Sequence, residues 1–311
     1  MSAEKSTAII LRVTEFSETS CVVTMLTREF GKITAIAKGA RRPKSPFESA
    51  LDLLSLVRVV FLHKTSGAMD LLTEARLERR FRSASKSLPR LYAGFFVVEL
   101  LRTLTEEKDP HPDLFDLAVD FIRGIDTEAP LTDLSLDRDA TQSLEITNYL
   151  LYFEIGMLQM LGHFPLLTNC VGCGRPRLQE TSVDFGLADG GLICQRCRPG
   201  KHDVITVSPD AIRALKRIAN QLISQLTNQF QVTDQLVRES PNHLFDNDRP
   251  KFLRALDDNA TPPSIVHEMQ NLILGYLQRL AGFEPRVQKF LNQGQSLDSW
   301  VRPIRSRTNH Y

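Results

Sequence analysis

The sequence is short of net charge, cysteine and long hydrophobic runs. Its 38 Lys and Arg residues against 37 Asp and Glu residues give a formal charge of +1, which argues against a protein that wraps DNA as histones do. Five cysteines in 311 residues are too few for a disulfide scaffold. The most apolar stretch, residues 91–101, contains Glu99 and is shorter than the ~20 residues that cross a bilayer. We therefore expect a globular cytosolic protein with no cleavable signal and no membrane contact.

The sequence also lacks the common motifs of nucleotide-binding and hydrolytic enzymes. It has no G-x4-G-K-[ST] phosphate loop, no G-x-G-x-x-G fingerprint and no G-x-S-x-G elbow. His267-Glu268 begins like a zinc-protease signature, but Asn271 stands where the second histidine is needed. Nothing here predicts an enzyme or a nucleotide cofactor.

The near-neutral total hides an uneven distribution of charge. Residues 1–82 carry 14 Lys and Arg against 9 Asp and Glu, a net of +5, whereas residues 83–169 carry 6 against 14, a net of −8. Such asymmetry indicates a basic binding face attached to an acidic body.

Two different periodicities divide the chain near Arg82. Before it, apolar and β-branched residues alternate with polar ones and Gly-bearing turns intervene, a pattern typical of a small barrel or sandwich. The predicted strands cover residues 9–13, 21–27, 32–38, 53–62 and 69–77. After it, apolar residues recur at helical spacing. The predicted helices cover residues 91–104, 113–125, 144–161, 209–224 and 263–280, with a Pro- and Asp-rich connection near residues 241–250.

Four of the five cysteines form the pattern C-x2-C-x20-C-x2-C, with ligands at Cys170, Cys173, Cys194 and Cys197. Each C-x2-C pair directs two sulfurs at one cation, and the pattern is that of a structural zinc site. Gly172 and Gly174 are expected to relieve the backbone at the first pair, where a positive φ is often required. The turn at Gly190-Gly191 precedes the second pair.

The same cysteines and the histidines near them fit other interpretations as well. The two C-x2-C pairs are also compatible with reduced thiols or a redox pair. His163 and His202 lie near enough in sequence to act as substitute ligands, although packing or surface roles are favoured. Cys21, in the apolar run CVVTML, is expected to be a small buried side chain.

The segment Lys38-Gly39-Ala40-Arg41-Arg42-Pro43-Lys44 places four cations in seven residues after the third predicted strand. Gly and Pro favour a loop, which suits contact with phosphates. A second cluster, Arg76, Arg79, Arg80 and Arg82, follows the fifth strand, and the two clusters form one basic surface if the barrel brings them together. Each is also explained by ordinary solvated side chains. Phe47, Phe61 and Phe81 offer base-stacking faces, although core positions are favoured.

Several segments together resemble the RecO family of bacterial recombination mediators. Gly31-Lys32 and residues 37–42 are similar to the family's N-terminal strand-and-loop signature, and residues 71–75 to its last barrel strand. Residues 158–174 (LQMLGHFPLLTNCVGCG) and 190–197 (GGLICQRC) resemble its central helix and zinc module. Residues 272–283 resemble its C-terminal helix, whereas residues 221–263 match nothing in the family.

The resemblance implies an α+β multidomain protein. Its parts are an N-terminal OB-fold β-barrel (residues 1–82), an α-helical domain (residues 83–167 and 200–311) and an inserted four-cysteine module (residues 168–199) holding one structural Zn²⁺. It implies a cytoplasmic bacterial protein, associated with the nucleoid during repair, and no enzyme.

The function implied is that of a DNA repair and homologous recombination mediator. It binds single- and double-stranded DNA, anneals complementary strands without ATP and helps load recombinase onto DNA coated by single-stranded-DNA-binding protein. The implied partners are DNA, RecR and the single-stranded-DNA-binding protein. The residues that match the family's basic loop are Lys38, Arg41, Arg42 and Lys44, with weaker matches at Arg12, Lys32, Arg76 and Arg79.

The alternative hypothesis is a zinc-stabilised adaptor that acts through protein contacts without significant DNA binding. A zinc hydrolase is disfavoured, because four cysteines fill every position of a tetrahedral metal.

Overall fold

The N-terminal part is a five-stranded barrel in the computed structural model, which describes residues 2–47, 50–64, 69–82, 87–126, 138–176, 183–236 and 261–282. Its strands are β1 (Ser2–Glu15), β2 (Cys21–Thr27), β3 (Gly31–Ala37), β4 (Leu56–His63) and β5 (Asp70–Arg79). They close in the order β1-β2-β3-β5-β4, with β3 and β5 parallel and the other neighbours antiparallel. The prediction of strands in this part is confirmed, and β1 is longer than predicted.

Alternation along the strands fills the barrel. In β3, Ile33, Ala35 and Ala37 point inward and are buried, whereas Lys32 and Thr34 are partly exposed. The three phenylalanines considered for base stacking, Phe47, Phe61 and Phe81, are 3%, 1% and 7% exposed, so they are core residues. Cys21 is buried in the barrel as expected.

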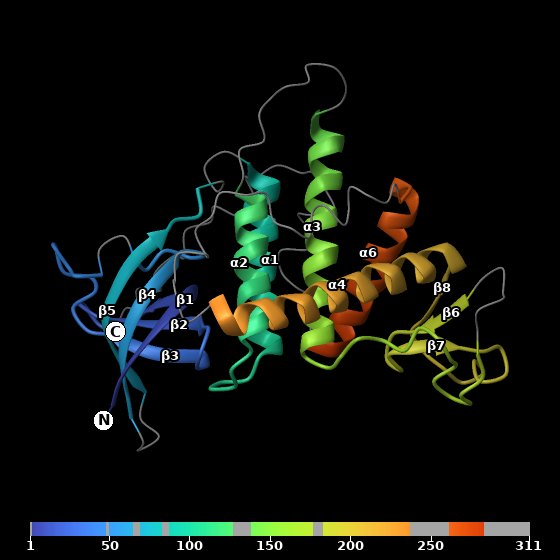
Figure 1. Ribbon diagram of the computed structural model, residues 1–311, viewed down its shortest axis with the longest axis horizontal. Helices are drawn as coiled ribbons and strands as arrows, with labels where there is room; N and C mark the ends of the chain where they lie inside the picture. The colour runs from blue at the N-terminus through green and yellow to red at the C-terminus, as the bar shows by residue number, and fades with distance from the viewer. Residues whose placement is uncertain are drawn as a thin grey trace, which may run out of the picture.

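The helices α1 (Leu88–Leu104), α2 (Pro112–Ile125), α3 (Arg138–Met160), α4 (Pro209–Leu236) and α6 (Pro263–Ala281) form the middle of the molecule (Figure 1). Proline near the N-terminus of α1, α2 and α6 fits the first turn, where its missing N–H costs no helical bond. Helix α4 continues past the predicted end at residue 224. The predicted connection at residues 241–250 lies outside the described residues. No helix in the described part is long and apolar enough to cross a membrane.

Several barrel side chains belong to the hydrophobic cluster of the helices, which is separate from the cluster that fills the barrel. Ile9 and Leu11 of β1 and Leu26 of β2 belong to the same buried cluster as Phe96 of α1 and Phe115 of α2. The barrel therefore rests on the helices through apolar side chains, and its orientation is fixed by packing as well as by polar contacts.

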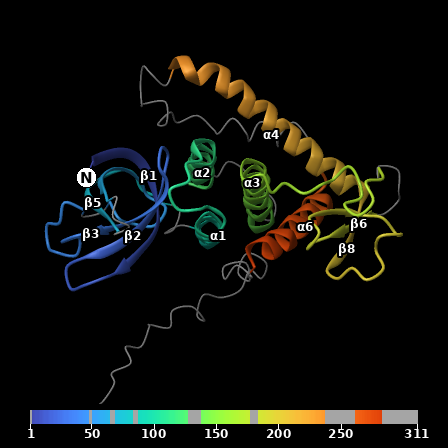
Figure 2. The same cartoon turned by 90° about the horizontal axis from the view of Figure 1, so that it is seen from below.

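A small sheet lies at the other end of the molecule. It consists of β6 (Val183–Gly186), β7 (Gly191–Ile193) and β8 (Val204–Val207) in the order β7-β6-β8. Strand β8 lies beyond residue 199, where the sequence predicted a return to helix. Figures 1 and 2 show the barrel and this sheet on opposite sides of the helices, and in Figure 2 α4 starts near the sheet and slants away from the other helices.

Candidate nucleic-acid interface and metal site

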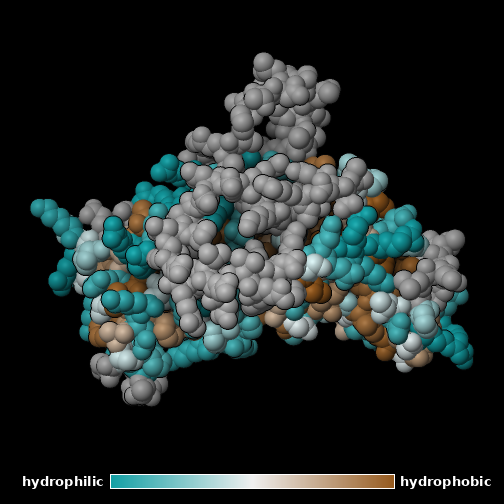
Figure 3. Space-filling view, in the orientation of Figure 1, coloured by the Kyte–Doolittle hydropathy of each residue, from teal (hydrophilic) through white to brown (hydrophobic). Residues whose placement is uncertain are grey.

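The cations of residues 38–44, called the basic loop below, lie in an exposed turn after β3. Lys38, Arg41, Arg42 and Lys44 are all exposed. Gly39 has φ +75°, and the N–H of Arg42 donates to the carbonyl of Gly39 over 3.1 Å, so the chain turns back on itself as a loop. Hydrophilic side chains project at the barrel end of the molecule in Figure 3.

Arg41 holds the basic loop against the β1–β2 turn. Its N–H donates to the carbonyl of Thr19 (3.1 Å), and its guanidinium donates to the carbonyl of Ser17 (3.1 Å) and pairs with Glu15 (2.9 Å). Lys38, Arg42 and Lys44 have no ion pair with any residue that the structure describes. One cation therefore positions the loop, and the other three present their charge to solvent.

Phe16 is a candidate binding residue that the sequence analysis missed. It lies in the β1–β2 turn beside the basic loop, with its N–H bonded to the carbonyl of Ser20 (3.1 Å), and its side chain is 62% exposed. An exposed aromatic ring next to cations suits stacking on an unpaired base. The signal was present, since Phe16 stands among polar residues between the first two predicted strands. Arg12 is exposed on β1 of the same hairpin, opposite Thr24.

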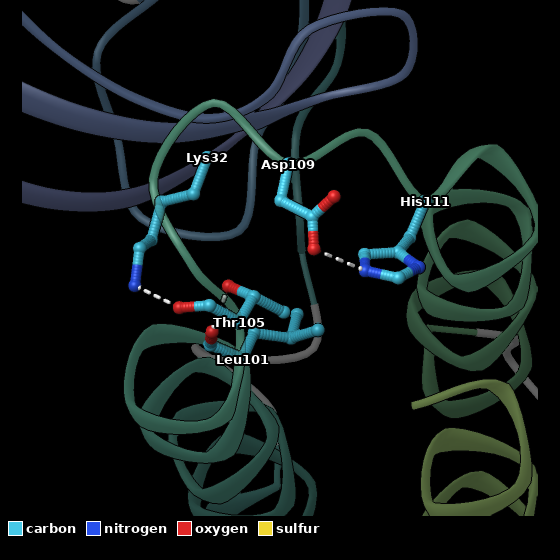
Figure 4. A network of polar contacts seen from close by, with 5 residues as sticks. All are labelled: Lys32, Leu101, Thr105, Asp109 and His111. Carbon is cyan, nitrogen blue, oxygen red and sulfur yellow. Dashed lines mark hydrogen bonds and ion pairs between the residues drawn. The ribbon is translucent and has the colours of Figure 1, made fainter. Parts of the chain in front are cut away.

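Lys32 has a different role from the one predicted. Its ammonium donates to the carbonyl of Arg102 (2.7 Å) at the C-terminal end of α1. It also donates to the carbonyl of Thr105, as Figure 4 shows. Burial lowers the pKa of Lys32, and a cation at this end of a helix is favoured by the helix dipole. Lys32 thus fastens the barrel to α1 and is not available to a phosphate.

The neighbouring residues explain why the segment Gly31-Lys32 has this sequence. Gly31 has φ +68°, and a Cβ there would lie 2.1 Å from the carbonyl oxygen of Asp109. Asp109 itself pairs with His111 just before α2 (2.9 Å). Arg28, which follows β2, donates two hydrogen bonds of 2.9 Å to the carboxylate of Asp116 in α2. This junction joins the barrel to the helices by close backbone approach and charge pairing.

Two members of the second arginine cluster (Arg76, Arg79, Arg80 and Arg82) form ion pairs with carboxylates of the protein, one of them at the junction. Arg79 pairs with Asp126 (3.5 Å), and Arg80 pairs with Asp52 (3.2 Å). Asp126 additionally accepts the backbone N–H of Arg82 (2.8 Å). Arg76 alone remains on the exposed outer face of β5, opposite Arg58.

The two basic clusters do not form one surface. Ala37, at the end of β3, lies beside Leu72 of β5, so the basic loop leaves the barrel near the start of β5. Arg76 and Arg79 lie about 13 and 23 Å further along β5 at ~3.3 Å per residue. In Figure 1 the loop after β3 points away from the helices, whereas the end of β5 leads into them.

The four predicted cysteines meet beside the small sheet. The sulfurs of Cys170, Cys173, Cys194 and Cys197 all lie within 4.8 Å of one another, and those of Cys173 and Cys194 are 3.7 Å apart. Sulfurs at about 2.3 Å from a tetrahedral zinc would be about 3.8 Å apart. These residues are therefore positioned to bind a metal ion, and four protein ligands leave no open position for a water.

Backbone groups prepare this site for a cation. Burial raises the pKa of the Cys170 thiol, but the N–H groups of Cys194, Cys173 and Gly172 outweigh burial and lower it to about 6. Gly174 has the expected positive φ of +73°, whereas Gly172 is needed for space, because its Cβ would lie 3.0 Å from the sulfur of Cys197. His163 and His202 are exposed and are not part of the cysteine group.

Two family models match the chain. One, described as recombination protein O N terminal, matches residues 1–81, and the other, described as recombination protein O C terminal, matches residues 85–244. The DNA repair protein RecO of Rhodopirellula baltica is 37% identical over 287 residues, covering 91% of this chain and 97% of the relative. The DNA repair protein RecO of Bacillus pumilus is 31% identical over 293 residues, covering 94% and 95%.

Proposed function

The chain belongs to the recombination protein O (RecO) family, and from this premise we propose that it is a DNA repair and recombination mediator that anneals complementary strands on its barrel end. The observation that carries this proposal is the basic loop, in which three exposed cations have no carboxylate partner among the described residues. Relatives named as DNA repair proteins match nearly the whole chain, which supports the same activity here.

We take the barrel, within residues 1–82, for an OB-fold. The closed order β1-β2-β3-β5-β4 and the parallel β3–β5 pair support this assignment. OB-folds bind single strands over strands 2 and 3 and the loops beside them. The basic loop and the β1–β2 turn, held together by Arg41, adjoin that face. The nucleic-acid site would therefore combine Lys38, Arg42 and Lys44 with Arg12 and Phe16.

The mechanism is electrostatic and makes or breaks no covalent bond. Cationic side chains replace the counterions around phosphates, which lowers the repulsion between two strands held close together. Phe16 would stack on an unpaired base and keep it exposed for pairing. Arg41 acts as a positioning residue, since it orients the loop through Ser17 and Glu15. No ATP is needed, because base pairing itself drives annealing.

The cysteine site would hold one structural Zn²⁺. The sulfur spacing and the lowered pKa of Cys170 fit a tetrathiolate site. A bound metal would supply folding free energy to a small module that extends over the short strands β6, β7 and β8. The module lies across the helices from the barrel (Figure 2), so its metal would not touch DNA bound at the basic loop.

The proposed setting is a bacterial cytoplasm, with RecR and single-stranded-DNA-binding protein as partners and recombinase loading as the outcome. The acidic segment, residues 83–169, would repel phosphates and so keep DNA away from that part of the helical body.

The test compares two double variants that change the net charge equally. Lys38→Glu with Arg42→Glu reverses two cations of the basic loop, and Lys5→Glu with Lys108→Glu reverses two exposed cations elsewhere. Single-strand affinity should fall about tenfold or more in the loop variant, and the slope of log affinity against log salt should shrink by about 1.4, that is, ~0.7 for each lost phosphate contact. Annealing without nucleotide should slow in parallel.

The control variant should bind within about twofold of the wild type, because exposed charges beyond a Debye length of about 8 Å are screened at physiological salt. Equal losses in both variants would remove the basic loop from the proposal. No DNA affinity even at low salt, with partner proteins still captured, would favour the adaptor hypothesis instead.

A further inference from the structure

A second cationic surface lies on α4, away from the barrel. It is a shallow, open hollow of about 580 Å³, and the described residues that line it all have polar side chains. These are Arg213, Lys216, Arg217, Asn220, Gln221 and Ser224.

The helical repeat places these side chains on one face. Positions 213, 216, 217, 220, 221 and 224 each have another member three or four residues away and so share one helix face, while Leu215, Ile218 and Leu222 on the opposite face are buried in the core. The stripe is about 16 Å long at 1.5 Å per residue, which matches about five nucleotides of a strand stacked at the 3.4 Å spacing of duplex DNA.

The positive charge of the stripe is poorly neutralised. Lys216 is partly buried, which lowers its pKa, and it has no carboxylate partner among the described residues. The guanidinium of Arg217 donates to the hydroxyl of Thr261 over 3.1 Å, a neutral acceptor. Arg213 pairs with Asp210 three residues earlier, and both side chains are more than half exposed, so this pair is easily exchanged for another anion.

The remaining lining groups fit the same class of ligand. The amides of Asn220 and Gln221 can donate hydrogen bonds without adding charge, as in contacts to phosphate oxygens along a nucleic-acid backbone, whereas the hydroxyl of Ser224 donates to the carbonyl of Asn220 (2.9 Å). An ammonium that has lost part of its hydration gains most from a full anion nearby. The chemistry of the surface therefore selects a polyanion with regularly spaced phosphates.

We propose that this face of α4 is a second binding site for the phosphodiester backbone of a single strand, used while the basic loop holds the first strand. The proposal rests on the proposed annealing function and deepens it. The small sheet leads directly into α4 through β8, and the first turns of α4 lie near that sheet, across the helices from the barrel (Figures 1 and 2). The two sites are thus far enough apart to engage different strands.

The test counts binding sites with an eight-nucleotide oligothymidylate, too short to span the molecule. The wild type should bind two such strands. Lys216→Glu with Arg217→Glu should bind one, and so should the loop variant Lys38→Glu with Arg42→Glu. The α4 variant should keep the affinity of the remaining site within about twofold and still slow annealing about tenfold. The milder Lys216→Gln with Arg217→Gln should lie between, and circular dichroism checks that each variant is folded.

The outcomes separate this inference from the proposed function. One site in the wild type, or an α4 variant that anneals at the wild-type rate, overturns the α4 site and leaves the basic loop standing. An unchanged loop variant overturns the proposed function itself. If the α4 variant loses affinity for a short poly-glutamate peptide but none for DNA, the surface is a site for an acidic peptide, and the inference is wrong. The Lys5→Glu and Lys108→Glu variant again controls for net charge.

Discussion

The basic loop and the second arginine cluster look alike in sequence and differ in structure. Each has four cations within seven residues. In the basic loop, Arg41 anchors the loop to the β1–β2 turn, and the other three cations are exposed without an ion pair among the described residues. In the second cluster, Arg79 faces Asp126, whose side chain is only 5% exposed, and Arg80 pairs with Asp52. The carboxylates brought alongside by the fold decide whether a cation binds a ligand or holds the protein together.

Metal removal should lower stability more than any other change proposed here. It should not alter the basic loop or the second arginine cluster. Cys194→Ser, or a strong chelator, should release the metal and unfold the module around β6, β7 and β8, because metal binding supplies folding free energy there. Elemental analysis should give about one zinc per wild-type chain, and hydrogen exchange should increase across residues 183–207. DNA affinity at the basic loop should stay within about twofold. A metal-free wild type of full stability would contradict the metal site.

A buried acid gives the strongest contrast with the exposed cations of the basic loop. Glu154 in α3 is 1% exposed, its Oε2 has no hydrogen-bond partner, and burial raises its pKa to about 8. The folded state therefore holds the proton more tightly than the unfolded state, and stability falls as the pH rises from about 4.5 through about 8. Between pH 6 and 9 the wild type should lose about 2–3 kcal/mol at this residue.

Glu154→Gln removes that titration, so its free energy of unfolding should depend less on pH over the same range. Urea unfolding at pH 6 and pH 9 measures both proteins. An equal pH dependence in the two would show that Glu154 is not a buried acid in the folded chain.

Truncating Arg79 tests whether the second arginine cluster stabilises the fold more than the basic loop does. Arg79→Ala removes the ion pair between Arg79 and the buried carboxylate of Asp126 and should lower the free energy of unfolding by about 1–2 kcal/mol. Arg42→Ala, in the basic loop, should change it by less than about 0.5 kcal/mol. Chemical denaturation measures both. Equal free energies of unfolding for the two variants would mean that Arg79 contributes no more to stability than Arg42 does.

Replacing Phe16 should have the smallest effect of these changes, and the effect should be on DNA binding alone. Phe16→Leu removes a stacking face and should weaken single-strand binding by about 1 kcal/mol, or roughly fivefold, at unchanged stability. Phe16→Trp keeps an aromatic face and should restore the affinity. Equal binding by the Leu and Trp variants would assign Phe16 no stacking role.

The sequence predicted those features that depend on short-range patterns. Alternation in Ile33, Ala35 and Ala37 located β3, and the paired C-x2-C spacing located the four cysteines. Roles that depend on distant partners were missed. Lys32 bonds to carbonyls some 70 residues away, and nothing in its own neighbourhood distinguishes it from Lys38. The same holds for Arg79 and Asp126, whose pairing exists only once the barrel is seated on α2.

The length of α4 and the position of β8 show a related limit. Residues 204–207 form a strand because β6 lies alongside them, and a short run such as VITV has no periodicity to reveal that. Helix α4 extends through polar residues that weaken the apolar stripe after Leu222, so the sequence pattern ends before the helix does.

The most direct test measures DNA affinity and stability together in two variants that each remove two charges. Lys38→Gln with Arg42→Gln should weaken single-strand binding about tenfold and leave the free energy of unfolding within about 0.5 kcal/mol of the wild type. Arg79→Gln with Arg80→Gln should do the reverse, with lower stability and an affinity within about twofold. A folded Arg79/Arg80 variant that loses as much affinity as the loop variant would contradict the account.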